Sequence, residues 1–415
     1  MKKNNSKSSG GFLDRRSFIK TGASLLTALA APSVLAGGDK GIKVPDAMLI
    51  PGAFDDEYGK PSGYEKAVKR LVMPNGNAAF TPLDRQRGII TPPGLHFGAH
   101  HSGIPTINPE EHELYIHGLT EKALRFTLED LARYPHEGGV MFLECSGNTW
   151  LQATSGEQAP DKSCAELYGL VSGSEWLGVP VRLLLEEAGI KPGGKWVIVE
   201  GSDAGTHARS IPIEKLLDDA IIALYQNGER LRPAQGYPMR LFLPGWEGNM
   251  NVKWVRRMEV VEAPAFTKDE SRAYTETLPD GSIEQFSFYM GVKSVITTPS
   301  GQQKLPAKGF YELNGLAWSG FGKISYVEVS DDDGKTWHKA QIHGPVLTKS
   351  LTRFTLPWQW SGNIARLQSR AVDEFGNRQP SHQEWKSKYL DGSYNHYNAI
   401  QTWEVAKDGG ISNVF

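Results

Sequence analysis

Apolar residues along this chain gather into short continuous runs, which predict buried strands in its first part. Val140 to Leu143, Trp196 to Val199 and Ile221 to Gln226 are such runs, and residues that favour turns follow each of them. The third run leads into Asn227-Gly228, a dipeptide typical of tight hairpins. A fourth apolar run ends at Leu243. The pattern therefore indicates a sheet-forming segment.

Helices are predicted between these strands. The stretch Val181 to Ala188 has Pro180 just before it and Gly189 just after it, and these residues are typical of a helix start and a helix end. The sequence Thr127-Leu-Glu-Asp130 is a capping box, which predicts a helix that ends before Pro135. Strands and helices therefore mix in this part of the chain.

Beyond Met290 the helical pattern disappears. Lys323 to Ser330 and Lys335 to Ile342 read as strands joined by the turn Asp331-Asp-Asp-Gly334, and Arg366 to Val372 reads as a third strand. Strands without intervening helices predict a β-sandwich of immunoglobulin-like character.

The two patterns together predict an α+β protein with the following order. Residues 37–264 form a mixed α/β domain that begins with an extended arm, residues 265–289 form a charged linker, residues 290–405 form the β-sandwich, and residues 406–415 form a tail.

The composition narrows the class of partner. The chain has 415 residues, 39% of them hydrophobic and 22% charged, which suits a globular protein with a large core. Its net charge of -2 gives no basic surface of the kind that binds nucleic acid or an anionic membrane. Both partners are set aside.

An export signal is predicted over residues 1–36. Asp14-Arg-Arg-Ser-Phe-Ile-Lys20 is a twin-arginine signature, and the apolar stretch Ala23 to Ala36 follows it. This stretch is short and contains Pro32, so it cannot span a hydrocarbon core of about 30 Å. We expect cleavage after Ala36, a mature protein without a membrane span, and a periplasmic location.

The chemistry is expected at Cys145, in the segment Met141-Phe-Leu-Glu-Cys-Ser-Gly-Asn148. A buried strand here ends in a thiol, and a turn of small residues follows. Three interpretations remain open from the residues alone. Cys145 is a metal ligand or nucleophile, a disulfide partner of Cys164, or an inert buried side chain.

Three other segments contain residues of interest. His96, His100 and His101 lie close in sequence, but zinc needs three or four converging ligands, so ordinary polar or anion contacts are favoured over a zinc site. The loops Glu200 to His207 and Gly245 to Lys253 contain glycines with polar residues, as loops around an anionic ligand do.

Long runs of the sequence are similar to the sulfite oxidase family of molybdenum enzymes. They are Cys145-Ser-Gly-Asn148, Leu224-Tyr-Gln-Asn-Gly-Glu-Arg230, Gly236-Tyr-Pro-Met-Arg240, Pro244-Gly-Trp-Glu-Gly-Asn-Met-Asn-Val-Lys-Trp254, Met290-Gly-Val-Lys-Ser-Val-Ile-Thr297 and Tyr394-Asn-His-Tyr-Asn-Ala-Ile-Gln401. Within the family, these runs most resemble the molybdenum subunits of sulfane dehydrogenases. The resemblance implies a molybdopterin-binding catalytic domain followed by an immunoglobulin-like dimerisation domain.

The resemblance also implies a cofactor. One pyranopterin dithiolene per chain binds molybdenum, and Cys145 is the single protein ligand of the metal, in agreement with the preference of a soft metal site for thiolate. Gln235 stands where relatives have a histidine. The family's contacts to the pterin and its phosphate match His101, Asp203, Arg240, Asn251, Val252 and Lys253.

The residues expected to act on substrate depart from the sulfite-oxidising pattern. Relatives have an arginine where this chain has Ala99, a tyrosine at the position matched to His207, and a further arginine at the position matched to His396. Lys162 matches a family lysine. We expect Cys145, His207, His396 and Lys162 to be catalytic. Because fewer side chains remain to bind a free anion, we expect the site to favour sulfane sulfur on a carrier-protein cysteine over free sulfite.

The resemblance implies partners as well. Electrons are expected to pass to a c-type cytochrome subunit, because this chain lacks a Cys-x-x-Cys-His sequence and is expected to hold no haem itself. The assembly is expected to be a homodimer or a heterotetramer with the cytochrome. The alternatives are a direct sulfite dehydrogenase, a molybdenum reductase of oxidised methionine, and, from another class, a cofactor-free periplasmic interaction protein.

Overall fold

The structure is a computed structural model that describes residues 48–49, 62, 64, 68–155, 159–389 and 395–414. Residues 66–415 form one compact unit, and residues 1–65 are a separate unit. The predicted twin-arginine signal, residues 1–36, lies outside the described residues. No helix in the described ranges has the length and apolar character needed to cross a membrane.

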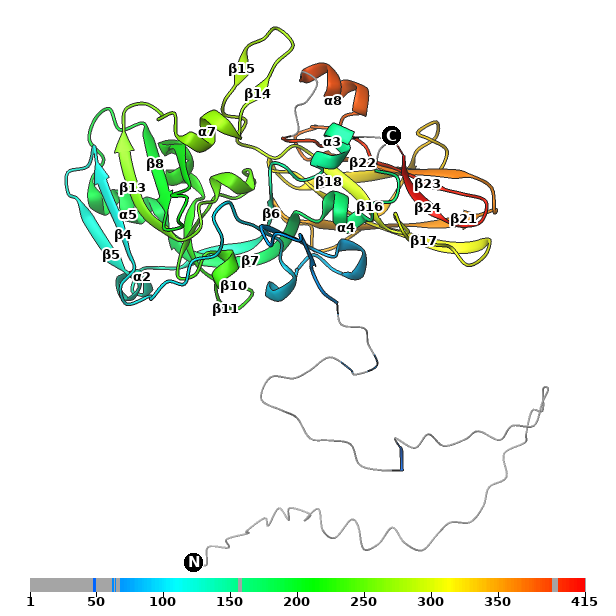
Figure 1. The fold of residues 1–415 in the computed structure, drawn as a ribbon, viewed down its shortest axis with the longest axis horizontal. Coiled ribbons are helices and arrows are strands. Elements are labelled where there is room, and N and C mark those ends of the chain that lie inside the picture. Colours follow the sequence, from blue (N-terminus) through cyan, green and yellow to red (C-terminus); the bar gives the residue numbers. More distant parts are fainter. Residues whose placement is uncertain are drawn as a thin grey trace, which may run out of the picture. The chain divides into compact units, whose positions relative to one another are not determined.

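The part of the chain that precedes residue 265 is called the first fold here, and it contains two five-stranded sheets (Figure 1). The outer sheet has the order β5 (Leu124–Thr127), β4 (Glu113–Gly118), β13 (Val255–Val261), β8 (Trp196–Gly201) and β9 (Ala208–Pro212). Only the pair β4 and β13 is parallel. The helices beside this sheet are α2 (Leu128–Ala132), α5 (Val181–Ala188) and α6 (Ile213–Asp218).

The second sheet presents Cys145. Its order is β11 (Glu229–Arg230), β10 (Ile221–Gln226), β7 (Val171–Pro180) and β6 (Glu137–Glu144), and β12 (Arg240–Phe242) also pairs with β10. Burial increases along β6 toward its end, so the last three residues are buried and Cys145 follows them directly.

The sequence-predicted elements of this fold are confirmed. The strands β6, β8 and β10 contain the three apolar runs, and α5 starts after Pro180 and ends at Gly189. Gly189 has a φ of 69°, a conformation that glycine adopts without strain. Helix α2 has the capping box at Thr127.

Short elements surround these sheets. They are β1 (Leu71–Val72), β2 (Ala78–Phe80) and β3 (Gly98–Ala99) in one small sheet, η2 (Leu83–Arg85), η3 (Pro93–Leu95), η5 (Pro233–Gln235), η6 (Gly248–Met250), α3 (Trp150–Ser155) and α4 (Cys164–Tyr168).

The second fold is the predicted β-sandwich. One sheet has the order β16 (Lys293–Thr298), β17 (Gly309–Trp318), β21 (Thr352–Trp360) and β20 (Gln341–His343). The other has the order β19 (His338–Lys339), β18 (Ile324–Ser330), β22 (Ala365–Asp373), β23 (Thr402–Val405) and β24 (Ile411–Val414), and α8 (His382–Lys388) lies outside both. The predicted α+β class is confirmed. The expected tail, however, contributes β24 to a sheet.

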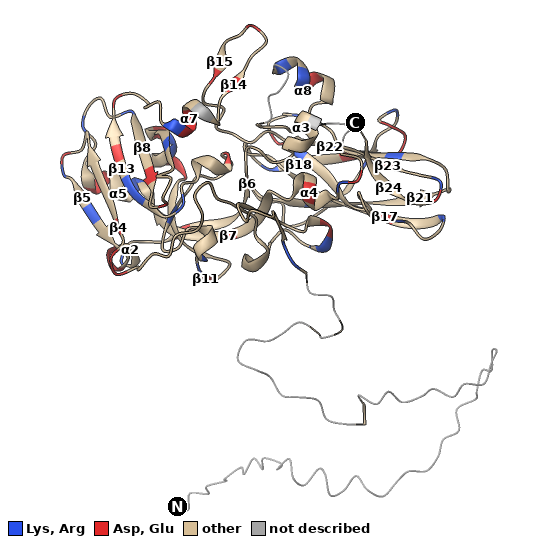
Figure 2. Cartoon of the chain, in the orientation of Figure 1, with Lys and Arg blue, Asp and Glu red and all other residues tan. Residues whose placement is uncertain are grey.

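One hydrophobic cluster extends from the sandwich into the first fold, which also has buried clusters of its own. Phe142, Leu167, Tyr168 and Val171 of the first fold belong to the same buried cluster as the interior of the sandwich. Basic and acidic positions are interspersed over both folds (Figure 2). Removal of the sandwich would therefore expose large apolar side chains that support β6 and β7.

The expected linker is ordered. It contains α7 (Lys268–Arg272) and the hairpin of β14 (Glu276–Thr277) and β15 (Ile283–Glu284). Thr267 caps α7, and Glu270 completes a capping box with it. Glu270 and Asp269 are buried despite their charge, so this segment packs onto the first fold.

Candidate active site

A pocket opens at the end of β6. It encloses about 740 Å³ of space not filled by atoms, part of which is open to solvent. The pocket is lined by Phe97, Gly98, Ala99, His100, His101, Leu143, Cys145, Asp203, His207, Ala234, Gln235, Arg240, Gly248, Asn249, Asn251, Lys253, Trp254 and Tyr274.

The Cys145 turn is held by Asn148. Its backbone N–H donates to Cys145 O at 2.9 Å, and its side-chain amide donates to Glu144 Oε1 at 2.9 Å. Its side-chain oxygen accepts from Leu170 N at 3.1 Å. These three bonds hold the turn in place, and Cys145 lines the pocket.

A second loop closes against this turn. A Cβ at Gly248 would lie 2.7 Å from Glu144 O and 3.1 Å from the Cys145 Cα, so only glycine allows the approach. Asn251 shapes the same loop, because its Oδ1 accepts from Leu243 N at 2.7 Å and its amide donates to Glu247 O at 2.9 Å. The loop therefore forms one wall of the pocket.

The Cys145 thiol is protonated in this environment. Burial raises its pKa to about 11, and the carboxylates of Glu144 and Glu247 act in the same direction. A nucleophilic cysteine has a lowered pKa, so the nucleophile interpretation lacks support. Cys145 and Cys164 are both free, which also removes the disulfide interpretation. A thiolate here would need a cation beside it.

Two buried cations lie in the pocket wall. The Arg240 guanidinium donates to Gln235 O at 3.1 Å and Asn251 O at 2.9 Å. The Lys253 ammonium donates to Ala99 O at 2.9 Å and lies 2.7 Å from His100 Nδ1. Burial lowers the pKa of Arg240 to about 9 and the pKa of Lys253 well below its usual value.

Neither cation forms an ion pair with a carboxylate among the described residues, although the more distant Asp203 carboxylate acts to raise the pKa of Lys253. All the acceptors above are neutral, and the Nε atom of Arg240 is buried without a hydrogen-bond partner in the described ranges. Buried charge without a counter-ion is unfavourable, so this wall is arranged for an anion that binds between the two groups.

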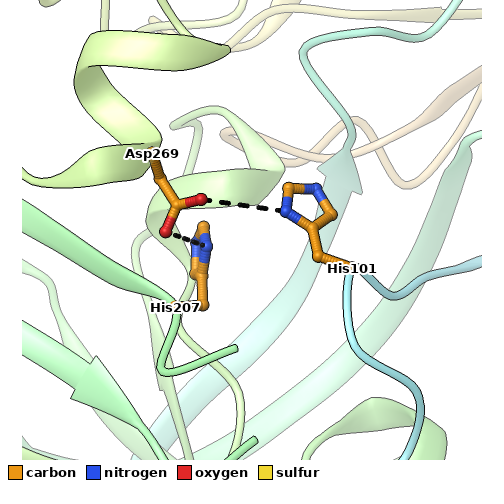
Figure 3. Close-up of side chains that lie close together, drawn as sticks. All are labelled: His101, His207 and Asp269. Atoms are coloured by element: carbon orange, nitrogen blue, oxygen red, sulfur yellow. Dashed lines mark ion pairs between the residues drawn. The ribbon is translucent and has the colours of Figure 1, made fainter. Parts of the chain in front are cut away.

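His101, His207 and Tyr274 line the mouth of the pocket, and Asp269 contacts the two histidines. His207 Nδ1 lies 3.1 Å from Asp269 Oδ2, and His101 Nδ1 lies 3.9 Å from Asp269 Oδ1 (Figure 3). The Tyr274 hydroxyl lies 3.0 Å from His101 Nε2. Asp203 shapes the neighbouring glycine-rich loop by accepting from His207 N at 3.0 Å.

His396 lies behind the loop that contains Gly248 and is not among the residues that line the pocket. Its Nε2 contacts Ser287 Oγ at 2.7 Å and Glu247 Oε2 at 3.2 Å. Burial alone would lower the pKa of His396, but the Glu247 carboxylate opposes this, and the net shift is upward. Glu247 also accepts from Asn249, which lines the pocket.

The structure brings most of the sequence-predicted site residues together, with three exceptions. Lys162 pairs with Glu166 at 2.9 Å and does not line the pocket. Val252 is a core residue whose backbone groups bond to Met250 and Leu241. His396 is the third. The lining members of the set are Cys145, His101, His207, Asp203, Arg240, Asn251 and Lys253.

Sequence reasoning missed Tyr274 and Asp269. Both lie in the segment expected to be a linker, and the capping box at Thr267 was the available signal for an ordered element there. Tyr274 lines the pocket and supplies a phenol there, although the position matched to the family tyrosine is His207.

The sandwich reaches the Cys145 turn through a buried ion pair. Glu144 Oε1 accepts from Lys293 Nζ at 2.9 Å, and Glu144 Oε2 accepts from Trp318 Nε1 at 2.6 Å. Both charged side chains are at most 1% exposed. Lys293 and Trp318 of the sandwich therefore support the strand end that precedes Cys145.

Replacing Lys293 with methionine is expected to lower the free energy of unfolding by about 3–5 kcal/mol, because it leaves the Glu144 carboxylate buried and uncompensated. Chemical denaturation measures this loss. The double variant Glu144→Gln, Lys293→Met should recover part of it, since no charge remains buried. Equal losses in the single and double variants would show that the ion pair is not the cause.

Comparison with known families agrees with the two folds. A model described as an oxidoreductase molybdopterin binding domain matches residues 101–268, and a model described as a Mo-co oxidoreductase dimerisation domain matches residues 284–402. The crystal structure of the sulfane dehydrogenase SoxCD from Paracoccus pantotrophus is 42% identical, with a TM-score of 0.85, over 90% of this chain and 100% of that chain.

Curated relatives are more distant. NADH nitrate reductase 2 of Phaseolus vulgaris is 31% identical over 77% of this chain and 40% of its own length. Mitochondrial sulfite oxidase of Drosophila melanogaster is 29% identical over 84% of this chain and 62% of its own length. The chain thus spans about 40% of the length of that nitrate reductase.

The pocket residues fit a molybdopterin. Such a cofactor carries a phosphate, and Arg240 and Lys253 offer two cations that form no ion pair with a carboxylate in the described ranges. It also carries a metal bound by sulfur, and the Cys145 thiol faces the same space. The positive charge of a metal would favour the thiolate that burial otherwise disfavours.

Proposed function

Because the chain belongs to the sulfite oxidase family of molybdenum enzymes, we propose that it oxidises sulfane sulfur attached to a cysteine of a carrier protein. Its cofactor is molybdenum in molybdopterin, which accepts electrons from a sulfur substrate and supplies oxygen to it when bound. The electrons leave to a c-type cytochrome subunit.

The residues in and around the pocket have separate roles in this proposal. Cys145 is the protein ligand of the metal. Arg240 and Lys253 anchor the phosphate, and His101, Asp203 and Asn251 border the pterin. His207 and Tyr274 stand at the mouth, where substrate enters, and His396 acts from behind the wall by fixing Glu247 and Asn249.

The observation that carries the choice of substrate is the small Ala99 side chain in the pocket wall. An arginine there would offer a bidentate contact to a small oxyanion. A carrier-bound substrate depends less on that contact, because it gains binding free energy from protein surfaces remote from the pocket. The 42% identity to a sulfane dehydrogenase supports the same choice.

The test is a comparison of two substrates with the purified protein and its cytochrome. We expect faster haem reduction with carrier-bound sulfane than with free sulfite. Ala99→Arg should shift the ratio of the two kcat/KM values toward sulfite by roughly ten- to a hundredfold, the value of one charge-assisted contact of about 1.5–3 kcal/mol. Ala234→Ser, at another lining position, is the control and should leave the ratio unchanged.

A direct sulfite dehydrogenase is the second candidate. It is favoured by Tyr274, which supplies a phenol to the pocket although His207 stands at the position of the family tyrosine. A wild-type enzyme that oxidises free sulfite with a low Michaelis constant and ignores the carrier substrate would replace the sulfane proposal with this one.

The location and assembly are also part of the proposal. The twin-arginine sequence over Asp14 to Lys20 supports export to the periplasm. The match of residues 284–402 to a dimerisation domain supports pairing of two copies through the sandwich. The cytochrome would then bind to this dimer.

A further inference from the structure

Arg209 is a fully buried cation beside the pocket, and the roles proposed above do not use it. It lies on β9, and neither its side chain nor that of Glu270, its partner on α7, is exposed. The contact from Arg209 Nε to Glu270 Oε1 is long, at 3.4 Å. Both terminal nitrogens, Nη1 and Nη2, are buried without a hydrogen-bond partner in the described ranges. Buried donors without partners lower stability, so the stability of the fold does not account for an arginine at this position.

The guanidinium of Arg209 faces an aromatic ring that lines the pocket. Its Cζ lies 4.8 Å from the centroid of the Tyr274 ring, which is within the range of a cation–π contact. The Tyr274 hydroxyl lies 3.0 Å from His101 Nε2, and both of these residues line the pocket. Arg209 is not among the lining residues, so the Tyr274 ring is its contact with the site.

The segment that brings Tyr274 to the pocket is attached to the same strand. Glu270 accepts hydrogen bonds from the backbone nitrogen and the hydroxyl of Ser210, the residue of β9 that follows Arg209. These bonds attach α7 to β9, and Arg209 contacts the ring that comes after α7. Because Glu270 is also held by the capping box with Thr267, replacing Arg209 should leave α7 in place.

The charge of Arg209 acts on the phenol as well. Burial raises the pKa of Tyr274 well above its usual value, and the positive charge of Arg209 opposes this rise. A phenol beside a cation is a stronger hydrogen-bond donor than a phenol in an apolar wall, because the cation stabilises the negative charge that donation leaves on the oxygen. A sulfur group that carries oxygen and negative charge can accept such a bond.

We propose that Arg209 is a positioning residue, which fixes the Tyr274 ring at the mouth of the pocket and strengthens the hydrogen bond that its hydroxyl donates to an anionic sulfur–oxygen group. This inference rests on the proposed function, since it takes a sulfur compound as the substrate. The cation supplies part of the positive charge that the small Ala99 side chain does not.

The first experiment tests the contact without a substrate. Fluorotyrosine is incorporated into the holoenzyme, and the fluorine NMR resonance of Tyr274 is assigned by its loss in Tyr274→Phe. Arg209→Met should move that resonance because the ring loses its cation, and Arg209→Lys should move it less. An unmoved Tyr274 resonance in Arg209→Met would overturn the proposal.

Arg370 provides the matched control. Its Cζ lies 4.1 Å from the centroid of the Trp337 ring, and its Nε lies 2.8 Å from Glu328 Oε2, so it has the same two kinds of partner in the sandwich. Arg370→Met should leave the Tyr274 resonance where it is in wild type, and it should leave turnover unchanged.

The second experiment measures haem reduction with carrier-bound sulfane. We expect Arg209→Met to lower kcat/KM by roughly tenfold, the equivalent of one buried cation–π contact, while molybdenum per chain stays the same. Arg209→Lys should recover part of the loss. Tyr274→Phe should be as active as the double variant Arg209→Met, Tyr274→Phe, because without the hydroxyl the cation has no donor to position. Losses that add in full would show that Arg209 does not act through Tyr274.

A further variant keeps the test decisive if Arg209→Met does not fold. The double variant Arg209→Met, Glu270→Gln removes both buried charges, so it should be at least as stable in chemical denaturation as wild type and still about tenfold less active. Wild-type activity in this double variant would overturn the proposal. If wild type itself turns over no sulfur substrate, the proposed function fails, and the fluorine resonance still decides whether Arg209 holds Tyr274.

Discussion

Replacing Cys145 with serine is expected to abolish turnover while the fold persists. Loss of the metal ligand should lower kcat on the order of a thousandfold, equivalent to about 4 kcal/mol of activation free energy. The reason is that a serine hydroxyl is a harder donor than a thiolate, and a metal already bound by sulfur prefers the thiolate. The fold should persist because the backbone of the turn, from Cys145 N to Leu170 O at 3.0 Å, does not involve the thiol.

The other cysteine provides the matched control. Cys164 is fully buried in the shared core, so Cys164→Ala should cost about 1 kcal/mol of stability, near the value of one lost apolar group, and leave turnover unchanged. Molybdenum analysis, steady-state kinetics and thermal unfolding measure the three quantities. Full activity in Cys145→Ser would exclude Cys145 as the metal ligand.

Much of the first fold could be predicted from the sequence because its signals are local. The strand before Cys145 is a continuous apolar run, and α5 has its proline and glycine at the expected ends. Such signals depend on neighbouring residues in the chain and not on tertiary contacts. The pocket could be placed for the same reason, since a thiol and turn at the end of a buried strand are visible in the sequence.

The parts that were missed depend on contacts between distant residues. Lys293 and Glu144 are 149 positions apart, and nothing local to either shows that they form a buried ion pair. Asp269 and Tyr274 lie in a charged segment that reads as a linker until the packing of α7 onto the first fold is known. Val252 was expected at the cofactor from the family resemblance, and its side chain belongs to the buried core cluster, which the sequence around it does not show.

Replacing Arg240 with leucine is expected to have opposite effects on cofactor binding and on the stability of the cofactor-free protein. Loss of a charge-assisted contact to phosphate should weaken retention of molybdopterin by roughly ten- to a hundredfold. The cofactor-free variant should be at least as stable as cofactor-free wild type, because a buried cation without an anionic partner has been removed.

The stability of the cofactor-free protein should also depend on pH through Arg240. Burial lowers the pKa of Arg240 to about 9, below its ordinary value of 12.5, so between these values the unfolded chain binds more protons than the folded chain. Stability of cofactor-free wild type should therefore rise with pH above about 9 through this group. The difference in stability between cofactor-free wild type and cofactor-free Arg240→Leu, measured by thermal unfolding, should therefore become smaller as the pH is raised from 8 to 10.5.

Arg353 is the matched control for this prediction. It is a buried arginine whose pKa is lowered to about 10 by burial, and it donates to Thr297 Oγ1 and Gly88 O and not to a carboxylate. It lies on β21, away from the pocket, so Arg353→Leu should retain molybdopterin as wild type does. Cofactor retention is measured as molybdenum per chain after gel filtration. If Arg240→Leu keeps its molybdenum, or if both variants lose it equally, then the Arg240 guanidinium does not anchor the phosphate, and the anion that this wall is arranged for must be the substrate.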